Sequence, residues 1–136
     1  MVISSSAIRM ICLLTACLCC WFTGCREKDA GYTTISVEEF ADLIADPEVQ
    51  RLDVRTVAEY SSGHIEESLN VNVLDEENFA KMAQAALDKE RTVAVYCRSD
   101  KRSKTAAKIL SERGFKVYEL KGGFNAWKEA GKPIQK

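Results

Sequence analysis

The sequence lacks an excess of charge of either sign and contains very little histidine. Its 136 residues carry 19 lysines and arginines and 20 aspartates and glutamates, a formal net charge of −1 at pH 7. No global basic field favours nucleic-acid binding, and no acidic tract favours a cationic partner. His64 is the only histidine, and the six cysteines contain no two matched Cys-x-x-Cys pairs. The sequence therefore argues against a zinc site and against a disulfide framework.

A long hydrophobic run is missing as well. Residues 10–22 form a mostly apolar stretch near the N-terminus, and as a helix they would span about 20 Å, less than the hydrocarbon core of a bilayer. This length is typical of the hydrophobic region of a signal peptide and too short for a transmembrane helix. We expect residues 1–24 to be a signal peptide, 25–31 a charged tether, and 32–136 one folded domain, in line with a composition that is 46% hydrophobic and 29% charged.

The predicted signal peptide ends before Cys25. The stretch Phe22-Thr23-Gly24-Cys25 resembles the lipobox of bacterial lipoproteins, in which the cysteine is lipidated and becomes the new N-terminus, although aliphatic residues usually stand at the place of Phe22. A rival box ends at Cys17, but it leaves a very short hydrophobic region. We prefer Cys25; ordinary signal cleavage and an uncleaved anchor are the alternatives. The prediction is an exported protein of the bacterial cell envelope, held on a membrane by a lipid anchor and facing the periplasm.

Cys97 is the only cysteine beyond the first 25 residues. A lone thiol in an exported protein usually has a reason to be there, because oxidising compartments penalise stray thiols. Cys97 ends the apolar run 92–96 and precedes a cationic segment in which a helix begins. A helix N-terminus and nearby arginine or lysine charges favour the thiolate. We expect Cys97 to be the reactive residue, within a loop that also contains Arg98, Ser99, Asp100, Lys101, Arg102 and Ser103.

Helical and extended patterns alternate from Tyr32 onward. Ser36 and Thr56 are each followed three residues later by a glutamate, a capping box that predicts a helix start. The uninterrupted apolar run 92–96 is typical of a strand buried on both faces of a parallel sheet. This alternation predicts an α/β fold with an open, mostly parallel sheet flanked by helices, and with its site beyond the carboxyl ends of the strands. We expect strands at 50–55, 70–73, 92–96 and 116–120, and helices at 37–46, 56–63, 76–87, 103–113 and 124–129.

The loop after Cys97 combines a strand end, a tight turn and a helix start. Such an arrangement turns successive backbone N–H groups toward one centre and binds anions. Four residues separate Cys97 from Arg102, one fewer than in the loops of protein phosphatases. The smaller ring suits a persulfide, or the terminal sulfur of thiosulfate, better than a phosphoryl group.

Four ordered motifs resemble those of the single-domain rhodaneses, a family of sulfurtransferases. Leu52-Asp53-Val54-Arg55 resembles the family's Asp-Val-Arg element, and the stretch 59–71 follows its Glu-[Phe/Tyr], Gly-His-Ile and Asn pattern. Residues 97–103 are similar to Cys-Arg-x-Gly-x-Arg-Ser, and residues 120–127 match the Gly-Gly and Trp close. The resemblance runs from about Thr33 to Gly131 and implies a rhodanese-like fold.

The resemblance also implies a double displacement without a metal or an organic cofactor. The Cys97 thiolate would take the outer sulfur of thiosulfate or of a persulfide donor, hold it as a persulfide, and pass it to cyanide or to a thiol, such as that of a thioredoxin-like protein. The loop amides would stabilise the persulfide anion, and Arg98 and Arg102 would attract the donor. Asp53 and Arg55 would form either an ion pair that supports the loop or a solvated surface pair.

Two departures from the family pattern carry expectations of their own. Asp100 stands where the family most often has glycine; aspartate tolerates left-handed backbone angles, so we expect the loop to form, with a carboxylate that opposes anion binding. Glu67-Ser68 replaces Gly-Ala, and we expect it to alter only a surface turn. We expect His64 to be structural and not a general base.

Two other functions stay open at this point. One is a sulfur carrier or binding module that takes up sulfur without turnover, because Asp100 has weakened the site. The other is a small phosphatase or arsenate reductase of related architecture, which the loop length disfavours.

Overall fold

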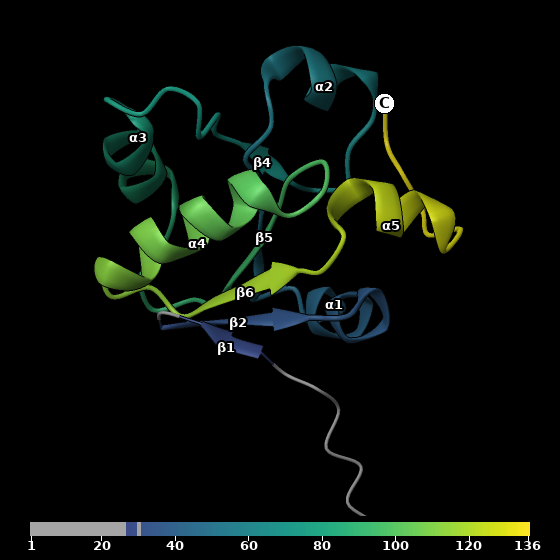
Figure 1. The fold of residues 1–136 in the computed structure, drawn as a ribbon, viewed down its shortest axis with the longest axis horizontal. Coiled ribbons are helices and arrows are strands. Elements are labelled where there is room, and N and C mark those ends of the chain that lie inside the picture. The colour runs from purple at the N-terminus through teal and green to yellow at the C-terminus, as the bar shows by residue number, and fades with distance from the viewer. Residues whose placement is uncertain (1–26, 30) are drawn as a thin grey trace, which may run out of the picture.

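The structure is a computed structural model that describes residues 27–29 and 31–136, with side chains from residue 31 onward (Figure 1). The predicted signal peptide, Cys17 and Cys25 lie outside the described residues. Within the described part of the chain, no helix has the length and apolar character needed to cross a lipid bilayer.

One sheet of six strands, in the order β1-β2-β6-β5-β3-β4, forms the centre of the domain. All neighbouring strands are parallel except β1, which runs antiparallel to β2 at the edge. This confirms the predicted α/β fold with an open, mostly parallel sheet. The strands are β1 (Glu27–Asp29), β2 (Tyr32–Ile35), β3 (Gln50–Asp53), β4 (Leu69–Asn70), β5 (Val93–Tyr96) and β6 (Val117–Leu120).

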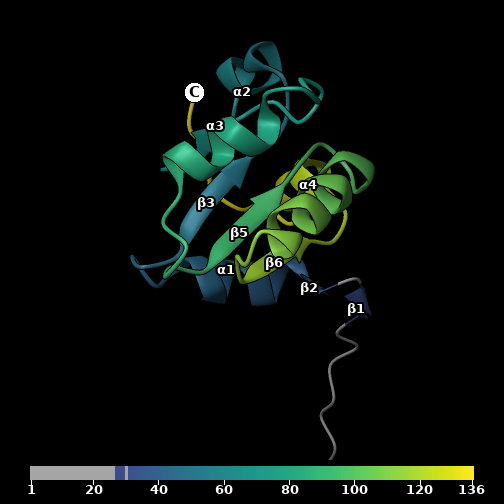
Figure 2. The ribbon, with the colours of Figure 1, turned by 90° about the vertical axis from the view of Figure 1, so that its left-hand side faces the viewer.

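Helices cover both faces of this sheet (Figures 1 and 2). The alternation along β5 divides the core, because Val93 and Val95 pack with residues of α3 and α4, whereas Ala94 and Tyr96 pack with residues of α1 and α5. The central strand is therefore buried on both faces, as its apolar run predicts. The helices are α1 (Val37–Ile44), α2 (Val57–Ser62), α3 (Phe79–Ala86), α4 (Lys101–Glu112) and α5 (Gly123–Glu129).

Both predicted capping boxes mark helix starts. The Glu39 N–H donates to the Ser36 hydroxyl at 3.2 Å, and at Thr56 the reciprocal bond from the Thr56 N–H to Glu59 is also present at 3.0 Å. Each cap satisfies N–H groups that the first turn of a helix leaves without partners.

Several predicted boundaries were wrong by a few residues. The helix expected at 76–87 begins at Phe79, because Asp75 first accepts turn bonds from the Asn78 and Phe79 N–H groups. The helix expected at 103–113 begins earlier, at Lys101, so that Arg102 lies in its first turn. Only Asn70 of the expected strand 70–73 lies in β4, since the chain turns where the Leu74 N–H donates to the Asn72 side chain.

The turn that contains Glu67 and Ser68 was only partly anticipated. Glu67 is exposed and has a φ of 61°, the one non-glycine residue of the described chain with a positive φ. The Ser68 N–H donates to the Ile65 carbonyl, which puts Glu67 at the position where such turns prefer glycine. Ser68 is buried, and its hydroxyl accepts a bond from Tyr96 at 3.1 Å. The Glu67-Ser68 pair therefore alters more than a surface turn, because Ser68 is part of the buried interior.

Replacement of Glu67 by glycine should raise the free energy of unfolding by about 1 kcal/mol, because a left-handed backbone is costly for a residue with a Cβ. Denaturant unfolding followed by circular dichroism measures the change. Glu66→Gly is the matched control in the same turn: its φ is not positive, so the substitution should lower stability. An equal change in both variants would contradict the argument.

Candidate active site

The carboxyl ends of β3 and β5 meet at one edge of the sheet. Asp53 and Tyr96, the last residues of these strands, are register partners, and the Val54 N–H donates to the Tyr96 carbonyl at 3.0 Å. Cys97 follows directly. The site therefore lies where open parallel sheets generally bind ligands.

Cys97 is a buried free cysteine with 1% of its surface exposed. Its Sγ lies 3.2 Å from the Ser103 hydroxyl, which is also buried. Ser103 Oγ lies 3.0 Å from the Asp100 carbonyl and 2.7 Å from a carboxylate oxygen of Glu119. The first turn of α4 thus brings one hydroxyl directly against the sulfur atom.

The N-terminus of α5 fixes the loop from behind. The Phe124 N–H donates to the Cys97 carbonyl at 2.8 Å, and the Asn125 N–H donates to the Arg98 carbonyl at 3.0 Å. A Cβ on Gly123 would lie 2.4 Å from the Ser99 carbonyl oxygen and 2.6 Å from that of Cys97. This close approach explains why α5 begins with a glycine.

The same bonds orient the other side of the loop. In a trans peptide the N–H points opposite to the carbonyl, so the N–H groups of Arg98 and Ser99 point away from α5. Neither these two groups nor the N–H of Asp100 donates to any acceptor within the described part of the chain. The loop therefore offers free donors of the kind that bind anions.

The backbone of Asp100 differs from the expectation. Its φ is −144°, so it does not use the left-handed conformation that was expected of it. Its carboxylate Oδ1 accepts the Gly122 N–H at 2.8 Å, which ties the loop to the turn before α5. The carboxylate therefore supports the loop, and that backbone bond already engages one of its oxygens.

Asp53 and Arg55 form a buried ion pair, which decides between the two alternatives that the sequence left open. The Arg55 Nη2 lies 2.7 Å from Asp53 Oδ2, with side-chain exposures of 4% and 0%. The guanidinium also donates to the Gly63 carbonyl at 2.7 Å and stacks over the Phe124 ring, 4.2 Å from its centre. The pair joins the end of β3 to α5 and so supports the loop.

We had expected Arg102 to attract the sulfur donor, but in the structure its side chain is paired with Glu59. Both of its terminal nitrogens donate to the Glu59 carboxylate, at 2.8 and 2.9 Å. The Arg102 guanidinium lowers the pKa of Glu59 to about 2. Glu59 also caps α2, so one carboxylate joins two helix starts. Sequence reasoning missed this role, although Glu59 belongs to one of the four motifs.

Glu119 was also missed. It lies in β6 with no exposed surface, and its two oxygens accept bonds from Ser103 at 2.7 Å and from Thr34 at 2.9 Å. Burial raises the pKa of Glu119 to about 7, although both hydroxyl bonds act in the opposite direction. A glutamate at an inward position of a short strand was the only signal in the sequence.

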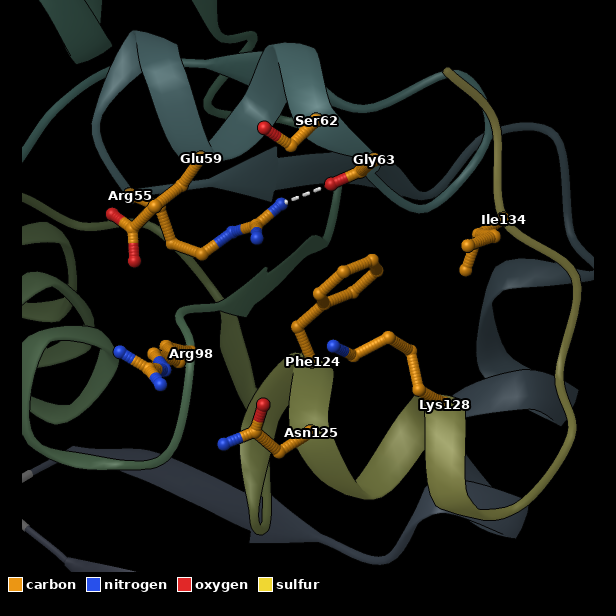
Figure 3. A pocket seen from close by; sticks show the side chains of 9 residues that line it. All are labelled: Arg55, Glu59, Ser62, Gly63, Arg98, Phe124, Asn125, Lys128 and Ile134. Carbon is orange, nitrogen blue, oxygen red and sulfur yellow. Dashed lines mark hydrogen bonds between the residues drawn. The ribbon is translucent and has the colours of Figure 1, made fainter.

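A pocket of about 310 Å³ opens beside the loop (Figure 3). Three cations line it, namely Arg55 at the strand end, Arg98 in the loop and Lys128 on α5, while Glu59 is its one anion. Since Arg102 pairs with Glu59, the excess charge is positive and favours an anionic ligand. Ser99 and Lys101 are exposed and lie outside the lining of this pocket.

His64 has a structural role, as predicted. Its Nδ1 lies 2.9 Å from the Tyr60 carbonyl, and its ring stacks on the Tyr60 ring at 3.8 Å. Its backbone exchanges two bonds of 2.8 Å with Gln135, which holds the C-terminal segment beside the pocket.

Comparison with known proteins assigns the domain. Residues 36–130 match the family model of the rhodanese-like domain. The chain belongs to the rhodanese-like family. It is 35% identical over 102 residues to the thiosulfate sulfurtransferase GlpE of Shewanella oneidensis, covering 74% of this chain and 97% of that protein. It is 36% identical over 89 residues to the putative sulfurtransferase YtwF of Bacillus subtilis, covering 65% and 82% of the two chains.

Solved structures agree with this assignment. The Alr3790 protein from Anabaena has a TM-score of 0.67 and 31% identity to this rhodanese-like chain, covering 74% of it and 80% of the Anabaena chain. A rhodanese-related protein from Thermoplasma volcanium has a TM-score of 0.66 and 26% identity, covering 75% and 96%. The comparisons confirm the predicted rhodanese-like domain of the sulfurtransferase type.

The substitution Gly123→Ala should lower the free energy of unfolding by roughly 2 kcal/mol or more and disorder the Cys97 loop, because the new methyl group overlaps two carbonyl oxygens. Gly131→Ala is the control: its φ is also positive, at 69°, but no atom lies within 4 Å of the added Cβ. It should cost only the backbone strain, about 1 kcal/mol. Chemical denaturation and amide hydrogen exchange of residues 97–103 measure both effects, and similar losses in the two variants would refute the clamp.

Proposed function

We propose that this rhodanese-like protein moves sulfane sulfur from thiosulfate or a persulfide donor to a thiol or to cyanide, through a persulfide on Cys97. One observation carries the proposal: the Cys97 sulfur lies at the start of a loop whose first N–H groups are free, beside a pocket of positive charge. These features together suit an anionic sulfur donor and an anionic persulfide.

The reaction consists of two displacements. In the first, the Cys97 sulfur attacks the outer sulfur of thiosulfate, the sulfur–sulfur bond of the donor breaks, and sulfite leaves with its electron pair. In the second, the acceptor attacks the outer sulfur of the persulfide and Cys97 is released as a thiolate. The protein divides one transfer into two easier ones. The free N–H groups of the loop would stabilise the negative charge on the bound sulfur.

Arg98 and Lys128 are the cations best placed to draw in the donor. Arg98 is exposed, and its side chain makes no hydrogen bond or ion pair within the described part of the chain. Lys128 lies across the pocket, with its ammonium 5.2 Å from the centre of the Phe124 ring (Figure 3). This role replaces the one first expected of Arg102, whose guanidinium Glu59 occupies.

The alternatives are less well supported. A phosphatase needs an arginine that grips the phosphoryl oxygens, and both terminal nitrogens of Arg102 are already bound to Glu59. A carrier without turnover was suggested by Asp100, but that carboxylate accepts the Gly122 N–H. Thiol acceptors, including a thioredoxin-like protein, fit an open pocket beside a buried sulfur.

We also propose that the protein is an exported lipoprotein anchored through Cys25, with Cys17 as the alternative. This proposal rests on the sequence of residues 1–25. Metabolic labelling with a palmitate analogue should mark the membrane fraction of cells expressing the full chain, and Cys25→Ser should remove the label whereas Cys17→Ser should keep it. Label that is retained in Cys25→Ser and lost in Cys17→Ser would assign the anchor to Cys17. A full-length chain that takes up no label would reject the lipoprotein proposal.

The Cys97→Ser variant should lose thiosulfate:cyanide sulfurtransferase activity completely, since a hydroxyl cannot carry sulfane sulfur. Intact mass after thiosulfate treatment should show a gain of one sulfur atom in the wild type and none in the variant. A sulfur adduct without steady turnover would indicate the carrier. Hydrolysis of an aryl phosphate that depends on Cys97 would indicate the phosphatase.

Arg98→Ala and Lys128→Ala should each raise KM for thiosulfate by about 3-fold to 10-fold at low salt, with a smaller change in kcat, because each removes one partly screened attraction for a dianion. The effect should shrink as ionic strength rises. Lys108→Ala, an exposed site on α4 outside the pocket, is the matched control and should leave KM unchanged. Equal KM values in all three variants would exclude the proposed donor route.

A further inference from the structure

Glu119 is a buried carboxylate that the transfer of sulfur, as described above, does not use. No exposed surface remains on it, and within the described part of the chain it forms no ion pair. Two hydroxyls, those of Ser103 and Thr34, are its partners. Burial of a carboxylate without a positive partner costs folding free energy, so the position of Glu119 calls for an explanation.

Glu119 is connected to the reactive sulfur through a single atom. The Cys97 Sγ lies 3.2 Å from Ser103 Oγ, and Ser103 Oγ lies 2.7 Å from Glu119 Oε1. The serine hydroxyl can accept the thiol proton on one side while it donates its own proton to Glu119 on the other. When Glu119 is protonated, the Ser103 hydroxyl can instead donate its hydrogen bond to the Asp100 carbonyl, at 3.0 Å.

The surroundings of Glu119 come from three elements. Its register partners are Thr34 in β2 and Val95 in β5, and α4 covers it through Ser103. Two charged groups act on it: Asp100 in the loop favours its protonated form, and Lys104 in α4 favours its ionised form. The titratable Cys97 lies beyond Ser103. Burial dominates and brings the pKa of Glu119 to about 7, where a proton can be exchanged readily.

We propose that Glu119 acts through Ser103 as a proton store for Cys97, receiving the thiol proton when sulfur is taken up and returning it after sulfur has left. The Cys97 sulfur and the Glu119 carboxylate flank one hydroxyl in a buried site, where two negative charges would repel each other. Glu119 is a positioning residue in this scheme, because it does not touch the sulfur that is transferred. The inference rests on the proposed Cys97 persulfide.

The steps balance. During uptake the Cys97 S–H bond breaks, its proton moves to Ser103 as the serine proton moves to Glu119, and the sulfur attacks thiosulfate; the products are the persulfide anion, sulfite and the neutral glutamic acid. During release the acceptor removes the outer sulfur, and Cys97 leaves as a thiolate. The proton then returns from Glu119 through Ser103 to Cys97. No oxidant or reductant beyond donor and acceptor is needed.

Single-turnover release of sulfite from thiosulfate, measured from about pH 5 to about pH 9, tests the proposal. In the wild type the rate should fall on the acid side of about pH 7, where Glu119 becomes protonated and can no longer accept. Glu119→Gln should lose this dependence and slow uptake about tenfold or more at neutral pH. Ser103→Ala should slow it similarly, and Glu112→Gln, an exposed carboxylate on α4, should behave as the wild type.

Thr34→Val separates a proton store from a merely structural residue. The Thr34 bond lowers the pKa of Glu119, so its removal should move the acid limb of the rate profile to higher pH. A structural role would instead scale the rate by the same factor at every pH.

Isotope-edited NMR of the Glu119 carboxyl covers the case in which Glu119→Gln does not fold. If Glu119 keeps the thiol proton after uptake, its titration midpoint should lie at higher pH in the thiosulfate-treated persulfide form than in the resting protein, because the persulfide anion is a like charge. An unchanged midpoint would overturn the inference. Wild type that takes up no sulfur would reject the proposed function itself, whereas normal uptake in the wild type with an unaltered rate and pH profile in Glu119→Gln would reject only the proton store.

Discussion

The two hydrogen bonds from the start of α5 to the loop are the constraint on which the rest of the site depends. They hold the carbonyls of Cys97 and Arg98, at 2.8 and 3.0 Å, and planar peptides then turn the following N–H groups the other way. Gly123 permits the approach because it has no side chain. Behind α5, the Asp53–Arg55 pair and the Phe124 ring under Arg55 fix the helix itself. The Cys97 loop is therefore shaped mainly by contacts with the start of α5 and the end of β3.

Asp100 stands where the family most often has glycine, and the loop accommodates it through a new hydrogen bond. A glycine at this place would leave the Gly122 N–H to find another acceptor, whereas the Asp100 carboxylate accepts it at 2.8 Å. The substitution thus exchanges backbone freedom for a charge-assisted bond to the turn before α5. The loop and the Gly-Gly turn become more tightly joined, and one of the carboxylate oxygens is committed to a backbone donor.

Local patterns predicted the fold better than they predicted the contacts of the site. The capping boxes, the apolar run of β5 and the position of Cys97 depend on neighbours in sequence, and all three were confirmed. The pairing of Arg102 was not anticipated because its partner Glu59, which binds both terminal nitrogens, lies 43 residues away in the sequence. Glu119 was missed because its importance comes from a register that sets β6 beside β2 and from α4 crossing above it. Such long-range pairings are fixed by the topology and leave no mark in the spacing of nearby residues.

The near-complete burial of Cys97 gives the domain a size filter. With 1% of its surface exposed, the sulfur offers almost no area to a bulky reagent such as a protein disulfide. Water and oxidants are held back by the same enclosure, so that a persulfide, once formed, would be sheltered from hydrolysis and from further oxidation. In an oxidising compartment, such enclosure allows one unpaired cysteine to persist without forming mixed disulfides with its neighbours.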